Sequence, residues 1–517
     1  MLGVPLLVAA VGAVAAGSLV GKRFLFGLAW LSLGAAAVLA LQVTFGKPEL
    51  VPGPWGLALV ADRLGALFSL LAAGIQATVL PYAARCLEGR AFRRFAVLSQ
   101  VLLMASELTG TAGTLSTLVL GWVLASVAVY ALVAGSGAVR GSARRVRTAF
   151  LWGDGALVAA LAVVWRFAGD PPLSRLTAVE GPLRALRIPL GPVVLTAADA
   201  VAVLVVVAAI MRSALWPGPR WLPSTLVAPT PVSALLHAGV VNAGGFLLIR
   251  LSPLFMATPA ASALALAAGL GTAALGSVAT AVRSDVKGAL VHSTMSQMGF
   301  MVAECAVGAY TAAAFHLVAH GMYKASLFLN SGDGIAGNVR GRQSSALSVA
   351  TPTRVRLSLA LTGAFGLIAL AVLIHPGLLA HRAGAVTVAF AAVTSGTLLW
   401  GWAERRPVSG LMPWALVPVA AGGVGYLLWF SAVAGWLTPA LRTAGPAVPS
   451  PLWLLGALGV AGGVMAGAVY AGRRPTVAAQ FHARALWGAW GRPSLPRAKP
   501  DAQRRRRLEV ASWKEPA

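Results

Sequence analysis

Charged residues are scarce in this sequence, at 11% of 517 residues, whereas soluble domains carry about a quarter. So few charged groups cannot cover a water-facing surface, and the composition excludes a soluble enzyme and a nucleic-acid-binding domain. Cysteine is nearly absent as well. Cys86 and Cys305 lie far apart, which excludes a disulfide framework and a cysteine-based metal site.

Signatures of nucleotide and redox chemistry are also missing. The sequence contains no phosphate-binding Walker loop and no dinucleotide-binding glycine motif in a strand–helix setting. Two cysteines are too few for an iron–sulfur cluster. We therefore expect no cofactor in this chain, and any driving force has to come from an ion gradient or from a partner.

Apolar residues dominate what is present, at 58% with a mean hydropathy of +0.79. A membrane span needs about 20 apolar residues, and about fifteen apolar runs lie between residues 4 and 472, the last three at 384–402, 413–435 and 453–472. The sequence thus predicts an all-α polytopic membrane protein with about 14–15 transmembrane helices. The run at 4–20 has no basic segment before it, so we interpret it as a retained helix rather than a signal peptide.

The basic residues predict the orientation of the chain in the membrane. The net charge is +26, and most of the arginines and lysines fall in alternate loops and in the tail after residue 472, which includes the run from Arg504 to Arg507. Because cytoplasmic loops carry the excess of basic residues, we expect the N-terminus outside and the C-terminus in the cytoplasm. A polybasic tail beside anionic lipid explains the charge without nucleic acid.

Ionisable residues inside the apolar runs are candidates for function, because each is costly in lipid unless it is paired or lines a wet cavity. They are Asp62, Arg63, Glu107, Asp154, Asp199, Arg212, His237, His292, Glu304, His316, His320 and Lys324.

His316, His320 and Lys324 follow one another at steps of four, which places them along one face of a helix. Imidazole changes its protonation near neutral pH, so this face predicts a proton relay. The alternative is that the histidines only brace neighbouring helices. A metal site is disfavoured, because the sequence His-Leu-Val-Ala-His lacks the glutamate of a zinc-protease helix.

Arg212 ends an apolar run and is followed by Trp216-Pro-Gly-Pro219, which predicts a helix that breaks there. A charge beside a broken helix is typical of ion sites in transporters, although an arginine that reaches the lipid headgroups is the alternative. Asp154 and Asp199 could supply its counter-charge.

The remaining groups allow fewer conclusions. His237 lies about two turns after the prolines at 229 and 231, deep enough to need a polar partner, and we favour a place on the proton path over bracing. We expect Asp62 and Arg63 to form a local pair. Glu107 and Glu304 are either proton carriers or interfacial residues.

Three segments resemble a known family of membrane proteins. Residues 228–239, residues 246–250 and residues 285–299 are similar to motifs of the proton-conducting subunits of respiratory complex I (NuoL type) and of Mrp antiporters. The resemblance covers roughly residues 55–335 and implies an antiporter-like bundle with a broken helix and a central hydrated axis. It suggests four parts: N-terminal helices (1–54), the proton-conducting core (55–335), C-terminal helices (336–472) and a basic cytoplasmic tail (473–517).

Within that superfamily, residues 297–301, residues 316–320 and residues 323–325 are similar to the DabB-type membrane subunits of inorganic carbon pumps. This resemblance implies a bacterial inner-membrane protein with a DabA-like cytoplasmic partner, to which a zinc ion would belong. Entry of protons or Na+ would drive CO2 hydration on that partner. The alternative is an ion-translocating subunit of a complex I-like (NADH-quinone oxidoreductase) or Mrp-type assembly, and a purely structural scaffold is a further alternative.

The chain departs from the NuoL pattern at three places. Gly121-Trp122 is followed by Val123 where that pattern has a glutamate. The expected lysine near the helix break is Arg212, which cannot lose its proton. A late lysine has no match near residues 364–382, where His375 and His381 are the nearest polar groups. The predicted path is therefore a conduit through His237, His292, His316, His320 and Lys324, with Arg212 as a fixed charge and Asp154 and Glu304 as counter-charges or carriers.

Overall fold

The structure is a computed structural model. It describes residues 4–17, 21–46, 49–52, 57–136, 140–190, 193–255, 258–283, 285–331, 353–374, 412–439 and 441, with short pieces between 384 and 399. It divides into Met1–Val464 and Met465–Ala517. The second unit, the basic tail and the expected span at 453–472 lie outside the described residues, as do His375 and His381.

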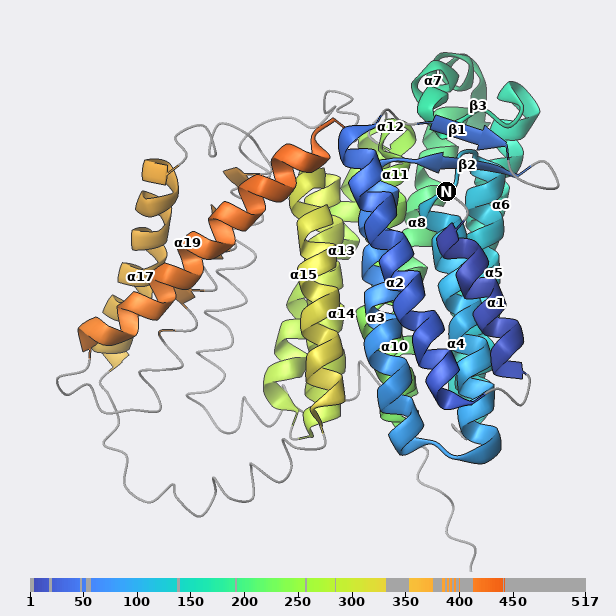
Figure 1. Cartoon of the computed structure of the whole chain (residues 1–517). Coiled ribbons are helices and arrows are strands. Elements are labelled where there is room, and N and C mark those ends of the chain that lie inside the picture. Colours follow the sequence, from blue (N-terminus) through green and yellow to red (C-terminus); the bar gives the residue numbers. More distant parts are fainter. Residues whose placement is uncertain are drawn as a thin grey trace, which may run out of the picture. The chain divides into compact units, whose positions relative to one another are not determined.

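Long helices make up most of the described chain (Figure 1). The first group is α1 (Val4–Gly17), α2 (Lys22–Phe45), α3 (Arg63–Cys86), α4 (Gly89–Gly110), α5 (Leu115–Gly135), α6 (Arg140–Ala168), α7 (Leu176–Ala185) and α8 (Ala197–Arg212). Those that follow are α9 (Trp221–Ser224), α10 (Thr230–Ala238), α11 (Ala243–Arg250), α12 (Ser252–Phe255), α13 (Pro259–Val282), α14 (Val286–Ala306), α15 (Tyr310–Leu329), α17 (Thr353–Ile374) and α19 (Met412–Leu437).

Two short antiparallel hairpins connect helices. Strand β1 (Glu49–Pro52) pairs with β2 (Ala58–Ala61), and β3 (Arg187–Leu190) pairs with β4 (Val193–Thr196). Three short 3-10 segments, η2 (Leu173–Arg175), η3 (Thr225–Val227) and η4 (Val240–Asn242), complete the described elements.

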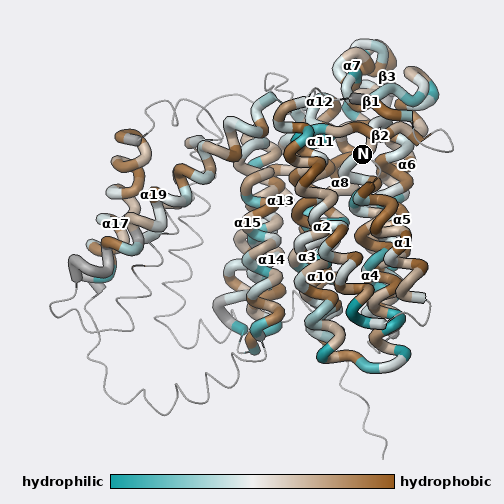
Figure 2. Tube along the Cα trace, in the orientation of Figure 1, coloured by the Kyte–Doolittle hydropathy of each residue, from teal (hydrophilic) through white to brown (hydrophobic). Residues whose placement is uncertain are grey.

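Eight helical stretches of the described residues are long and apolar enough to cross a membrane. Brown dominates α1, α2 and α5 in Figure 2, while the α3–α4 turn is teal. Helices α4, α14 and α15 are as long but carry more polar side chains. The all-helical membrane architecture predicted from the sequence is confirmed.

Small residues allow close packing of the helices that carry the polar groups. A Cβ atom on Gly269 of α13 would lie 2.6 Å from the Gly299 carbonyl oxygen of α14, and one on Gly299 would lie 2.5 Å from the Gly269 oxygen. Larger side chains would therefore separate the two backbones. This close contact is typical of helix pairs in lipid. It fixes the position of α14, the helix that carries His292 and Glu304, against α13.

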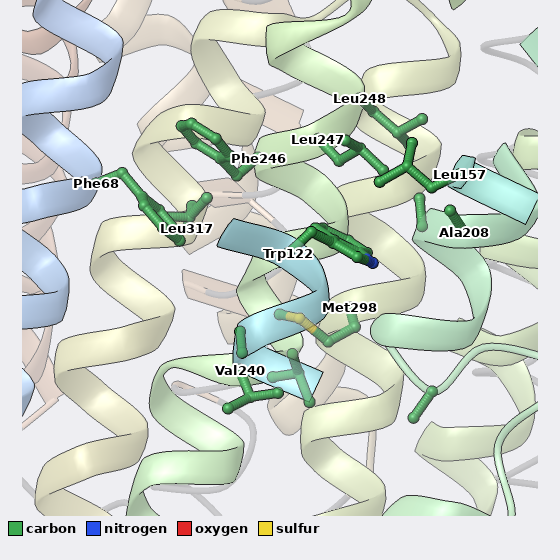
Figure 3. Close-up of a cluster of buried hydrophobic side chains, with 14 of the residues drawn as sticks. Phe68, Trp122, Leu157, Ala208, Val240, Phe246, Leu247, Leu248, Met298 and Leu317 are labelled. Atoms are coloured by element: carbon green, nitrogen blue, oxygen red, sulfur yellow. The ribbon is translucent and has the colours of Figure 1, made fainter. Parts of the chain in front are cut away.

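A large apolar core holds the bundle together. Phe68 of α3 stacks on Phe246 of α11, with ring centroids 4.3 Å apart. Trp122, Met298 and Val240 belong to the same cluster, although they come from α5, α14 and η4 (Figure 3). The core thus joins helices from across the sequence around the centre of the bundle.

The chain interrupts its helices at two places in this bundle. Helix α8 ends at Arg212, and α9 begins only at Trp221, as the Pro-Gly-Pro sequence predicted. The second interruption was not predicted: between α10 and α11 the chain turns through the 3-10 segment η4. The run expected at 228–250 is therefore one candidate span, Thr230–Arg250, whose two short α-helices are joined by a 3-10 segment; we call this interruption the break between α10 and α11.

Asp62 and Arg63 do not form the local pair that we expected. Asp62 forms an ion pair with Arg250 at the end of α11 and also accepts a hydrogen bond from the Gly65 backbone at the start of α3. Arg63 instead donates to the backbone oxygens of Val43, Thr44 and Trp436. Neighbouring residues at a helix start point in different directions, so each finds a partner on a remote helix.

We expect Asp62→Ala to lower the free energy of unfolding by about 3 kcal/mol, because it leaves the mostly buried Arg250 without its carboxylate. Thermal unfolding in detergent measures the loss. Glu180→Ala is the control: its pair with Arg184 is half-exposed, and such pairs contribute about 0–1 kcal/mol. Equal destabilisation by both variants would contradict the structural role of the Asp62–Arg250 pair.

Candidate functional site

The site is built on the buried face of α15. The side chains of His316, His320 and Lys324 are 9%, 4% and 1% exposed, whereas Met322 and Tyr323 on the same helix are 57% and 60% exposed. Steps of four residues thus separate a polar inner face from an outer face that is open to lipid. The three groups point into the bundle, where each has a different partner.

His316 is paired with a carboxylate. Its Nδ1 lies 2.9 Å from Oε2 of Glu304 on α14, and both side chains are buried. An imidazole beside a carboxylate can take up and release a proton while the pair stays hydrogen-bonded. Because His316 is the first of the three residues along α15, this pair forms one end of the polar groups on the helix.

His320 contacts the break between α10 and α11. Its Nδ1 lies 3.2 Å from Oδ1 of Asn242, and the Asn242 amide nitrogen donates to the backbone oxygens of Ala238 (2.7 Å) and Leu317 (3.3 Å). His320 Nε2 has no hydrogen-bond partner among the described residues. Asn242 was not identified from the sequence, although a buried amide within the apolar run 228–250 was a signal for it.

Lys324 lies further along the helix, next to α14. Its Nζ donates to Ser293 Oγ (2.9 Å) and to the Leu290 carbonyl oxygen (3.2 Å), so the ammonium has no acidic partner among the contacts that the structure describes for it. Ser293 is a second residue that sequence reasoning missed. Two neutral oxygens from α14 therefore hold the Lys324 amine in place.

His237 lies near Lys324, and His292 lies near His237. His237 of α10 stacks on Phe328 of α15 with ring centroids 4.4 Å apart, and it is within electrostatic range of both Lys324 and His292. His292 Nδ1 lies 2.8 Å from the Gly288 carbonyl oxygen of its own helix. The structure therefore brings six of the eight predicted site residues together. These six residues and Asn242 form what we call the central polar line: Glu304, His316, His320, Asn242, Lys324, His237 and His292.

Arg212 and Asp154 form a separate cluster. Arg212 Nη2 lies 3.1 Å from Asp154 Oδ1 on α6 and 2.5 Å from Ser126 Oγ on α5. The guanidinium is sandwiched between Trp122 and Phe150, at 4.1 and 4.6 Å from the ring centroids. The arginine therefore points into the bundle, with Asp154 as its counter-charge.

Asp199, the other counter-charge considered for Arg212, has a different role. It caps its own helix: the Thr196 hydroxyl accepts from the Asp199 backbone, and the Asp199 carboxylate accepts from the Thr196 backbone. This reciprocal pair stabilises the start of α8, whereas Arg212 ends that helix.

The two helix breaks are joined by one hydrogen bond. Ser213, the residue after Arg212, donates from Oγ to the Val241 carbonyl oxygen of η4 (2.8 Å). Val241 precedes Asn242, which contacts His320. The Arg212 cluster is therefore next to the central polar line without sharing a side chain with it. Among the described residues, no group of three His, Cys, Asp or Glu side chains could hold a metal ion.

We expect Asp154→Asn to cost about 3–5 kcal/mol of stability, because it leaves a buried guanidinium uncompensated. The double variant Asp154→Leu/Arg212→Met removes both charges, and methionine packs well against the two aromatic rings, so most of the stability should return. Thermal unfolding of the three proteins in detergent measures this coupling. A double variant as unstable as Asp154→Asn would contradict it.

The sequence and the fold of this chain are similar to those of known membrane proteins. Residues 112–400 match the family described as NADH:quinone oxidoreductase/Mrp antiporter, transmembrane. A probable inorganic carbon transporter subunit DabB1 of Halothiobacillus neapolitanus is 37% identical over 286 residues, 54% of this chain and 50% of that protein. The corresponding DabB of Bacillus subtilis is 34% identical over 287 residues, 55% of this chain and 54% of its own. These matches span about half the length of each relative.

A NAD(P)H-quinone oxidoreductase chain 5 of Picosynechococcus is 44% identical over 137 residues, 26% of this chain and 21% of that protein. Two solved structures share the fold. The Mrp complex of Dietzia has a TM-score of 0.62 at 24% identity, over 99% of this chain and 59% of that one. Complex I of Thermus thermophilus has a TM-score of 0.54 at 21% identity, over 84% of this chain and 100% of that one. Since the family model covers more than half of the chain, this multi-pass membrane protein belongs to the NADH:quinone oxidoreductase/Mrp antiporter transmembrane family.

Proposed function

We propose that this chain is a cation-conducting membrane subunit that passes protons through the central polar line. The observation that carries the proposal is a buried row of titratable side chains from three helices, α10, α14 and α15, which meet at a helix break. Burying several ionisable groups in one bundle is costly, and in membrane proteins such groups mark ion and proton pathways.

The chemistry of the line favours protons over Na+. Four of its seven members are imidazoles and one is an amine, which are nitrogen groups that bind and release protons. Hard metal cations prefer several oxygen ligands, and the carboxylate of the line, Glu304, is hydrogen-bonded to His316. Conduction of Na+ instead is an outcome that the transport assay below separates.

Each residue has a part in this proposal. Lys324, with His237 near it and His292 near His237, exchanges a proton at one end of the line. His320 passes it across the break, where Asn242 holds the ring in place. His316 and Glu304 carry it to the other end. Arg212 stays charged and, paired with Asp154, sets the electrostatic potential next to the break.

The assembly that we propose is an energy-coupled inorganic carbon pump, with the chain in a bacterial inner membrane, its N-terminus outside and its C-terminus in the cytoplasm. The relatives named as inorganic carbon transporter subunits support this over half of the chain. The partner would be a DabA-like cytoplasmic zinc protein, and the zinc would be bound by that partner. The basic loops and tail would provide its docking face.

The alternative is an ion-translocating subunit of a complex I-like or Mrp-type assembly. The relative from Picosynechococcus supports it. Val123 and Arg212 argue against it, because a carboxylate and a deprotonatable lysine of the NuoL pattern are missing from these positions. A pump stroke that uses those two groups is therefore not open to this chain.

We expect His320→Leu to slow proton uptake by about a hundredfold, because removing one proton-transferring group from a relay commonly costs this much. His320→Asn, which keeps a polar contact to Asn242 but cannot carry a proton, should be slowed equally. The measurement is a pH-sensitive dye inside vesicles that contain the protein with its native partners, with protons or Na+ as the imposed gradient.

Tyr323→Phe is the matched control, since Tyr323 lies on the exposed face of the same helix, and its uptake should equal that of the wild type. Normal expression with undiminished uptake in both His320 variants would remove the relay and leave a structural scaffold. Uptake that requires a Na+ gradient and does not respond to a proton gradient would show that the conducted cation is Na+ rather than the proton.

Co-purification tests the proposed partner. We expect the full-length chain, solubilised mildly from its native membrane, to bring with it a large soluble-domain protein that carries zinc. Mass spectrometry identifies the partner, and a zinc assay on the separated proteins locates the metal. Recovery of redox or antiporter subunits instead would favour the alternative assembly.

A further inference from the structure

Glu107 of α4 is a buried carboxyl group that lies outside the central polar line. Its side chain is 0% exposed, and neither carboxyl oxygen has a hydrogen-bond partner in the part of the chain that the structure describes. Arg250, the cation near this end of α4, is engaged with Asp62 and with the Gly110 carbonyl oxygen. Among the described residues, Glu107 therefore has no free cation beside it to compensate an ionised form.

A second polar group without a partner faces it from α3. Ser69 is 0% exposed, and its hydroxyl is also without a hydrogen bond in the described structure. Its hydroxyl lies 3.6 Å from the position that a Cβ atom would take on Gly110, one turn beyond Glu107 along α4. The hydroxyl is therefore the polar group near the Glu107 carboxyl, although the two do not form a hydrogen bond of normal geometry in the structure. The small glycine leaves the two side chains room to approach each other.

Further polar side chains continue along the same helix interface. The Gln76 amide of α3 donates to Ser99 Oγ (3.0 Å) and to Gln100 Oε1 (2.8 Å) of α4. Gln76 follows Ser69 by seven residues, and Gln100 precedes Glu107 by seven, which is about two helical turns. The α3–α4 interface therefore carries a polar stripe formed by Ser69, Glu107, Gln76, Ser99 and Gln100.

A cavity connects this stripe with the break between α10 and α11. Its volume is about 40 Å³, which holds a few water molecules where polar groups line the space. The α3 and α4 side of the lining includes Gln76, Ser99 and Ser106, and the opposite side is Leu235, Gly239 and Val240. The cavity thus lies between the Gln76–Ser99 part of the stripe and Gly239 and Val240, the residues that lead to Asn242.

An ionised carboxylate with no cation beside it is costly in an apolar interior, and this favours a bound proton on Glu107. We propose that Glu107 is a second proton-binding group of this chain, which exchanges its proton with the central polar line through the hydrated α3–α4 interface. This inference rests on the proposed function, and it adds a branch that the histidines and Lys324 do not provide.

Infrared spectroscopy tests the binding of the proton directly. Spectra of the full-length protein with its native partners in lipid should contain the carbonyl band of a protonated, buried carboxylic acid, shifted in D2O. Glu107→Gln, which keeps the size and neutrality of the protonated side chain, should remove that band. Glu88→Gln is the matched control, because Glu88 lies exposed at the start of the same helix. A band that persists in Glu107→Gln overturns the proposal.

Vesicle uptake tests the exchange. We expect Glu107→Gln to lower proton uptake, by less than the roughly hundredfold expected for a group on the main path because Glu107 serves a branch, while Glu88→Gln leaves it unchanged. Loss of the band with undiminished uptake would overturn the proposal that Glu107 exchanges its proton with the central polar line. If the wild type conducts no cation, the proposed function fails, whereas the infrared band still decides whether Glu107 binds a proton. Ser69→Ala, which removes only a hydroxyl, should lower uptake in the same direction as Glu107→Gln.

Discussion

Charged side chains inside this bundle have to find their partners within the protein, because hydrocarbon offers none. The ion pairs that meet this requirement join remote helices: Arg212 with Asp154 links α8 to α6, and Arg250 with Asp62 links α11 to α3. Each pair fixes the rotation of both helices about their axes, since a helix turned away would expose an unpaired charge. Electrostatic pairing thus complements apolar packing, which is less directional.

Helix breaks meet a related requirement for the backbone. Where α10 ends, carbonyl oxygens lose their helical partners, and the Asn242 amide satisfies that of Ala238 while its oxygen faces His320. At the end of α8, Ser213 satisfies the carbonyl of Val241 in the other break. Polar side chains are needed at interruptions because unpaired backbone groups are costly in lipid. The same requirement gathers the titratable groups at the centre of the bundle.

The sequence predicted what depends on local spacing and could not predict what depends on contacts across the fold. The four-residue steps predicted that His316, His320 and Lys324 share a face, and Pro217-Gly-Pro219 predicted the end of α8. The partners of those residues come from other helices. Ser293 and Asn242 are neutral residues in apolar runs, so their contacts with Lys324 and His320 could not be predicted from the sequence. The pair expected between Asp62 and Arg63 was wrong for the same reason, because adjacency in sequence does not place two side chains opposite each other.

The Arg212 cluster restricts how the proposed conduction can work. In the pattern that the chain resembles, a glutamate follows Trp122, but here the carboxylate stands on the neighbouring helix as Asp154. The cation is an arginine, which keeps its proton under all physiological conditions. Such a pair can separate and close, but its cation cannot hand a proton to the next group. Every transfer step therefore has to occur among imidazoles, Lys324 and carboxyl groups, while Arg212 changes only the potential in which those steps take place.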